Sequence, residues 1–168
     1  MKPNYLTILI TTLCIFFNAC HNSNTAPQLQ LADSLIDKRA DSALCILEKL
    51  SIEEISNKSA KAMYALLLTE ALDKNFKSHR NDSLILIAVD YYKDNSNNKL
   101  KTKAYYYLGR VYQDNKEYIK ATEAYLTALK TASPNQAPIL QIYNNLALCY
   151  ESQEFYLPAI KTYKESYA

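Results

Sequence analysis

The sequence predicts an all-α fold made of antiparallel helix pairs. The 168-residue chain is 49% hydrophobic and 21% charged, yet it holds a single glycine, whereas β-rich folds use many glycines in turns. It also repeats itself, because residues 105–130 align without a gap on residues 143–168. Such repeats stack each helix pair on its neighbour. Seven positions recur 38 residues later: Tyr105, Leu108, Gly109, Tyr112, Tyr118, Ala121 and Tyr125 become Tyr143, Leu146, Ala147, Tyr150, Tyr156, Ala159 and Tyr163.

Residues 1–19 are predicted to be a secretory signal peptide. Lys2 precedes an uncharged, largely apolar run from Tyr5 to Phe17, and the small Ala19 follows. That run of 13 residues would span about 20 Å as a helix, against about 30 Å of bilayer hydrocarbon. A cleaved leader is therefore favoured over a permanent transmembrane helix.

A cysteine stands directly after the predicted cleavage site. The tetrapeptide "FNAC", which ends at Cys20, resembles the bacterial lipobox, and the resemblance implies a lipid on Cys20. Residues 20–28 would then form a flexible polar tether at the bacterial cell envelope, on the periplasmic face or the cell surface. The alternative is a soluble secreted protein with an accidental cysteine at this place.

A helical array is predicted over residues 29–168. Its clearer repeats lie at about 102–134 and 140–168, with helix-breaking prolines between them. Degenerate units are expected at about 29–50 and 53–95, and Ser51 with Glu54 is expected to form a capping box for the helix that follows. Gly109 faces Ala121, and Ala147 faces Ala159, where the two helices of a pair should approach closely.

The spacing of the repeat resembles the tetratricopeptide repeat. An aromatic residue is followed by Leu, a small residue and Tyr, and then by Ala and an aromatic residue in a second helix. The usual unit has 34 residues, and the extra four are placed in the turn "TASPNQAP". The resemblance implies a right-handed superhelix of antiparallel helix pairs that binds a protein or peptide partner.

The order of segments resembles a narrower group, the tetratricopeptide lipoproteins of Bacteroidetes-type bacteria. The lipobox is followed by "ADSLIDKRADSALCILEKL", "YALLLTEALDKN" and "DSLILIAVDYY" before the tyrosine-rich repeats. Longer members can carry a transmembrane helix, a coiled coil or a DNA-binding domain, which implies the sensing part of a regulator. The sequence stops inside the second helix of a repeat, so the alternative is a truncated or vestigial structural fragment with no ligand.

The family resemblance also implies a groove on the first helices of the clearer repeats. Tyr106 is expected to face this groove, while Tyr105, Tyr112, Tyr118 and Tyr125 are expected to hold their helix pair together. The predicted groove is mixed in polarity and weakly basic. Its residues are Lys103, Tyr106, Arg110, Gln113, Gln141, Asn144, Asn145 and Leu148.

No residue pattern points to catalysis, to a cofactor or to a metal. His21 and His79 have no cysteine or carboxylate at ligand spacing and no evident nucleophile, so an enzyme is not expected. Cys45 and Cys149 lie in apolar helical patterns and are expected to be buried. A formal charge of +2 without a Lys/Arg cluster argues against nucleic-acid binding.

Three Asp-Ser pairs, at Asp33, Asp41 and Asp82, begin short "DSL" or "DSA" motifs. They are interpreted as helix starts, in which the side chains accept hydrogen bonds from free backbone N–H groups. They also resemble the acceptor motif for O-glycans in Bacteroidetes-type secreted proteins.

Overall fold

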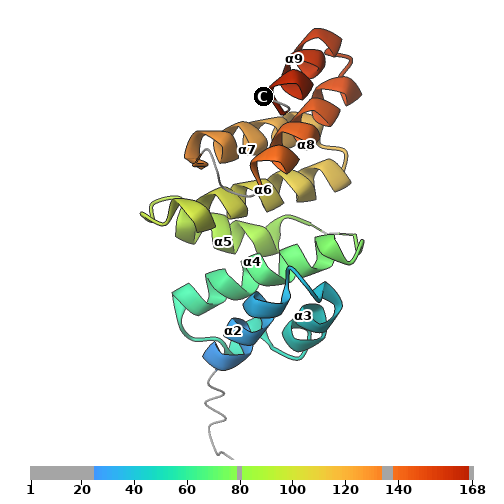
Figure 1. Cartoon of the computed structure of the whole chain (residues 1–168). Coiled ribbons are helices and arrows are strands. Elements are labelled where there is room, and N and C mark those ends of the chain that lie inside the picture. The colour runs from blue at the N-terminus through green and yellow to red at the C-terminus, as the bar shows by residue number, and fades with distance from the viewer. Residues whose placement is uncertain (1–24, 79–80, 134–137, 167–168) are drawn as a thin grey trace, which may run out of the picture.

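The computed structural model describes residues 25–78, 81–133 and 138–166, and within these ranges it contains helices and no strand (Figure 1). The helices are α2 (Ala26–Leu35), α3 (Ala40–Leu47), the 3-10 turn η1 (Ile52–Glu54), α4 (Lys58–Lys74), α5 (Ser83–Tyr92), α6 (Asn98–Asp114), α7 (Tyr118–Thr131), α8 (Ile139–Ser152) and α9 (Tyr156–Ser166). The all-α prediction is therefore confirmed.

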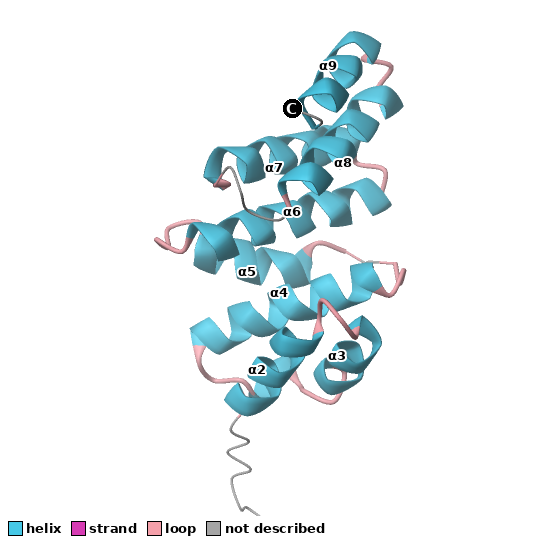
Figure 2. Ribbon diagram, viewed as in Figure 1, coloured by secondary structure: helices cyan, strands magenta, loops and turns pink. Residues whose placement is uncertain are grey.

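Successive helices form four antiparallel pairs, α2 with α3, α4 with α5, α6 with α7, and α8 with α9. Figure 2 shows the pairs stacked in order, with loops only at the helix ends. Each second helix also packs on the first helix of the following pair, and α2, α4, α6 and α8 contact one another in sequence. The first helices thus lie side by side along the array.

The buried side chains form two clusters, and α4 contributes to both. Tyr64, Leu67 and Ala71 of α4 join the smaller cluster, which α2, α3 and the residue after η1 complete. Other residues of α4, among them Leu66, belong to the larger cluster that runs through α5, α6 and α7 to α8. Because α4 is covered on opposite sides, it is apolar over most of its circumference.

The single glycine brings α6 and α7 together through an aromatic ring. A Cβ atom on Gly109 would lie 2.4 Å from Cε1 of Tyr125, which is closer than carbon atoms can approach. Ala121 on α7 is fully buried, as the close approach of the two helices requires. In the next repeat Ala147 takes the place of Gly109, and Tyr163 is less buried than Tyr125.

The chain leaves α4, α6 and α8 with the same backbone geometry. Phe76, Lys116 and Glu154 have φ values of 55°, 61° and 61°, in the left-handed region that glycine usually occupies. After each of them an N–H group returns to a carbonyl five residues back, as from Lys77 to Leu72 at 3.0 Å. The turns therefore end their helices alike although their sequences differ.

Several predicted helix starts are placed differently. The predicted capping box of Ser51 and Glu54 is wrong, because the Ser51 hydroxyl group donates to the Glu53 carboxylate and caps no helix. The cap of α4 is Asn57, whose side chain accepts from the N–H groups of Ser59 and Ala60. The array begins at Ala26 rather than at residue 29, since Pro27 fits the first turn of a helix and Leu29 is buried. Part of the expected 20–28 tether is thus helical.

The Asp-Ser pairs do not cap helices with their carboxylates. Asp33 lies inside α2, and Asp41 lies in the first turn of α3 after the N-cap residue Arg39. Asp82 does occupy the N-cap position of α5, but its side chain accepts instead from the hydroxyl group of Tyr112, 3.1 Å away. The interpretation as caps therefore fails for side chains at all three places.

Candidate functional site

The surface formed by α4, α6 and α8 is called the first-helix face, and it carries the eight predicted groove residues. On α6, Arg110 points toward the preceding pair, where its Nε atom donates to Oδ1 of Asp73 on α4 at 2.8 Å. Its Nη2 atom lies 3.6 Å from Oδ1 of Asp114. Burial opposes the charge of Arg110, but Asp73 outweighs that effect and raises the pKa of the guanidinium group. The residue is therefore fixed by its neighbours.

A buried carboxylate holds the second predicted cation. Glu70 on α4 is 1% exposed, and its oxygen atoms lie 2.5 Å from Nζ of Lys103 and 3.1 Å from Nζ of Lys74. Burial and then Glu70 raise the pKa of the adjacent Tyr107, so its hydroxyl group stays protonated. A carboxylate this deep is retained only with such partners.

The row of charges continues to the first helix pair. Lys74 lies 2.5 Å from Oδ1 of Asp37, in the turn between α2 and α3. Its hydrogen bond to Lys74 lowers the pKa of Asp37. For Lys74, burial lowers the pKa, but the bonds to Asp37 and Glu70 outweigh it and raise the value. Ion pairs thus join α2–α3, α4 and α6 along one face.

Hydrogen bonds between uncharged groups continue the row to α8. The Asn145 amide donates to the Tyr106 hydroxyl oxygen at 3.4 Å, and the Tyr125 hydroxyl donates to Oε1 of Gln113 at 2.7 Å. The expectation that Tyr106 faces a groove is wrong, because it is only 7% exposed and packs edge-on against Tyr107. Burial raises its pKa to about 12.

Part of the first-helix face remains open, and it lies on α8. Leu148 is 42% exposed and Gln141 is exposed, while Asn144 is half-buried. Leu148 occupies the repeat position of Arg110, so an apolar side chain stands where the previous repeat has a cation. Of the eight predicted residues, the structure therefore leaves these three for a ligand.

The acidic partners of this face were missed in the sequence reasoning. Glu70 and Asp73 lie in the apolar segment "LLLTEALDK", and a glutamate in such a segment followed four residues later by Lys74 signals a helical ion pair. The pairing of Glu70 with Lys103 depends on how α4 and α6 pack, which the spacing alone does not give.

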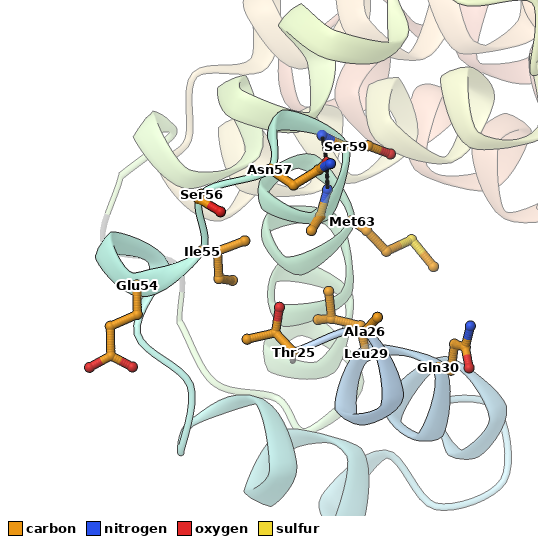
Figure 3. Close-up of a pocket in the computed structure, with 11 residues that line it drawn as sticks. Thr25, Ala26, Leu29, Gln30, Glu54, Ile55, Ser56, Asn57, Ser59 and Met63 are labelled. Carbon is orange, nitrogen blue, oxygen red and sulfur yellow. Dashed lines mark hydrogen bonds between the residues drawn. The ribbon is translucent and has the colours of Figure 1, made fainter. Parts of the chain in front are cut away.

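Three hollows lie outside the open part of α8. One of them, of about 780 Å³, is at the start of α2 and α4 (Figure 3). A second, of about 550 Å³, lies among α7, α8 and α9, with Leu157 and Tyr150 in its lining. A third, of about 280 Å³, has Phe76 and Arg110 in its lining.

The cysteines differ from each other. Cys149 is buried as expected, and burial raises its pKa to about 11, but Cys45 is exposed, contrary to the prediction, because it lies on the outward side of α3. Cys20, His21 and His79 lie outside the described residues. Within the described ranges, acidic, cysteine and histidine side chains form no group that could hold a metal, and no helix there has the length and apolarity to cross a bilayer.

Comparison with known proteins agrees with this architecture. Residues 101–168 match the model of the tetratricopeptide repeat family. Two crystal structures of MamA are similar in fold, with TM-scores of 0.55 and 0.56 at 23% and 22% sequence identity. The matches cover 85% and 87% of this chain, and 71% and 78% of the MamA chains. No curated protein matches the sequence. Residues 101–168 thus belong to the tetratricopeptide repeat family, and the chain as a whole is similar in fold to MamA.

Proposed function

We propose that this chain is a scaffold that binds a protein or peptide partner and is held at the bacterial cell envelope by a lipid on Cys20. Repeat arrays expose long continuous surfaces, and their usual use is to bind other proteins. The observation that carries the proposal is the division of the first-helix face. Its charged side chains on α4 and α6 are fixed by each other, whereas Gln141, Asn144 and Leu148 on α8 remain open.

The ion pairs of α4 and α6 hold the first helices together, so the open residues of α8 stand on a fixed backbone and little backbone entropy is lost when a partner binds. Leu148 offers an apolar contact, and the amides of Gln141 and Asn144 can donate to or accept from a peptide backbone. These groups are uncharged, so they support a partner recognised by shape and hydrogen bonds rather than by a strong charge.

Site-specific photo-crosslinking in living cells tests the binding part. A crosslinking residue at position 144 or 148 should capture one discrete partner, and Leu148→Glu should abolish the capture from position 144. The matched control is position 123, exposed on the second helix α7. Equal capture at positions 123 and 144, or none at either, would refute binding at this face.

The anchor is tested separately. Cys20→Ser should move the protein out of the membrane fraction, and the intact mass of the native protein should show a diacylated residue 20. Native protein that starts elsewhere, or that carries no lipid, would remove the anchor and leave the binding surface untouched. The resemblance to longer lipoproteins extends the proposal to the sensing part of a regulator, so Leu148→Glu should also change transcription in the same way as deletion of the gene.

A further inference from the structure

The hollow of about 780 Å³ at the start of α2 and α4 lies at the end of the array opposite α8. It is bounded by the first turn of α2, by the connection from η1 to α4 and by the first turns of α4 (Figure 3). Leu29 and Ile55 form an apolar floor and are 4% and 2% exposed, and Ala60 and Met63 extend it. Its volume of about 780 Å³ is in the range of ligand sites.

One wall of the hollow is a short extended segment with free backbone groups. Ile55 has φ −83° and ψ 105°, and Asn57 has φ −79° and ψ 127°, which are strand-like values. Among the described residues, no hydrogen bond uses the N–H or carbonyl group of Ser56, the carbonyl of Ile55 or the N–H of Asn57. Such a segment can pair with an added strand.

Charge restricts what can bind. Glu54 is the only ionisable residue among those that line the hollow, so an anionic ligand would meet a carboxylate and no cation. The start of α4 offers no anion site either, because the Asn57 side chain already accepts from Ser59 and Ala60. The hollow therefore fits an uncharged or basic ligand.

Shape separates a chain segment from a small molecule. The hollow is open to solvent along its length, whereas sites for small ligands enclose most of the ligand surface. Three residues of an extended peptide span about 10 Å, which matches a wall of three residues. The ends of a longer peptide can leave the open hollow on either side.

We propose that this hollow binds an extended, uncharged or basic segment of a partner protein, which pairs as a strand with residues 55–57 and places one apolar side chain on Leu29, Ile55 and Met63. The proposal rests on the proposed function and gives it a second contact site, remote from α8. The alternation of an extended chain sets the specificity, because only every second side chain of the segment would face the floor.

The test starts from a phage-displayed heptapeptide library selected on the full chain, followed by titration of the best synthetic peptide. Ser56→Pro removes one N–H group, and the extended Ile55 before it is compatible with proline. Ser56→Ala is the matched control that keeps the N–H group. Affinity should fall about five- to tenfold in Ser56→Pro and stay unchanged in Ser56→Ala.

A second measurement does not depend on folding of the proline variant. Methylation of alternate peptide nitrogen atoms should weaken binding to the unmodified chain, and the amide of Ser56 should become protected from hydrogen exchange, because successive N–H groups of an extended segment point to opposite sides. Selected peptides that bind equally to both variants, and that Leu148→Glu abolishes, would overturn this inference while the proposed function stands. Failure to select any peptide would count against both.

Discussion

The Nε atom of Arg110 donates to Oδ1 of Asp73 at 2.8 Å, and this bond joins the first helices of two successive repeats. The two side chains are 23% and 14% exposed, so the pair is shielded from water. A cation on this face therefore serves the packing of one repeat on the next. It follows that tests of stability and tests of partner binding should separate along the face.

Gly109→Ala should destabilise the protein by about 1–3 kcal/mol. An alanine normally favours a helix over glycine, but here its Cβ would overlap the Tyr125 ring, which would have to move. Urea unfolding measures the change. In the matched variant Ala147→Gly no ring is displaced, and the loss should be about 1 kcal/mol, from helix propensity and the missing methyl group. A stabilised Gly109→Ala would contradict the packing described.

Glu70→Gln should cost about 2–4 kcal/mol, since it leaves the partly buried ammonium group of Lys103 without its carboxylate and Lys74 with Asp37 alone. Thermal and urea unfolding at neutral pH would measure it. Glu165→Gln is the control, because that carboxylate is exposed and lies 3.9 Å from an exposed lysine. Its effect should stay within about 0.5 kcal/mol. Equal effects of the two variants would argue that the ion pairs of Glu70 with Lys74 and Lys103 do not stabilise the array.

Phe76→Gly should stabilise the protein by about 1 kcal/mol. Phe76 holds a left-handed backbone with φ 55°, and its ring is 98% exposed, so little packing is lost with it. Phe76→Ala removes the ring but keeps the backbone cost, and it should show no such gain. If both variants gained equally, the exposed ring rather than the backbone would be the cause.

Alkaline pH should unfold the array through its buried tyrosines. Burial raises the pKa of Tyr92 and of Tyr106 to about 12, and raises those of Tyr107 and Tyr125 further. Their unfolded pKa is about 10, so the folded state binds more protons above that pH. The stability that these protonated tyrosines contribute is fully present below pH 10, and it is lost as the pH rises toward their pKa values in the folded state.

The fall of the unfolding free energy with pH can be assigned to single tyrosines. Each such tyrosine should contribute up to about 1.4 kcal/mol per pH unit to the fall of the unfolding free energy. Tyr106→Phe should reduce the slope between pH 10 and 12 by one such share, as urea unfolding at several pH values would show. The control variant is Tyr156→Phe, which removes the hydroxyl group of an exposed ring. Identical slopes in both variants would contradict the burial of Tyr106.

The helix pairs, and the aromatic and small residues that hold each pair together, could be predicted because they depend on spacing along one repeat. Tyr125 and Ala121 recur 38 residues later and are buried as expected. The burial of Tyr106 and Tyr107 could not be foreseen in this way, because α6 is packed by α4, α7 and α8 at once. A residue that faces outward from its own helix pair can thus face inward in the array.

The candidate site was predicted only in part for the same reason. Gln141 and Leu148, which the family resemblance placed in a groove, are exposed. Lys103 and Arg110 are held by acids of α4, whose register against α6 is set by packing and not by the repeat offset. The hollow at residues 55–57 was not predicted at all, since an unpaired extended backbone leaves no motif in the sequence.

The central claim is that the cations of the first-helix face, Lys103 and Arg110, join successive repeats and do not bind a ligand. A double-mutant cycle with Asp73→Asn and Arg110→Gln, followed by urea unfolding, tests it most directly. The account predicts a coupling free energy of about 1–3 kcal/mol between the two substitutions. Additivity within about 0.5 kcal/mol would contradict it.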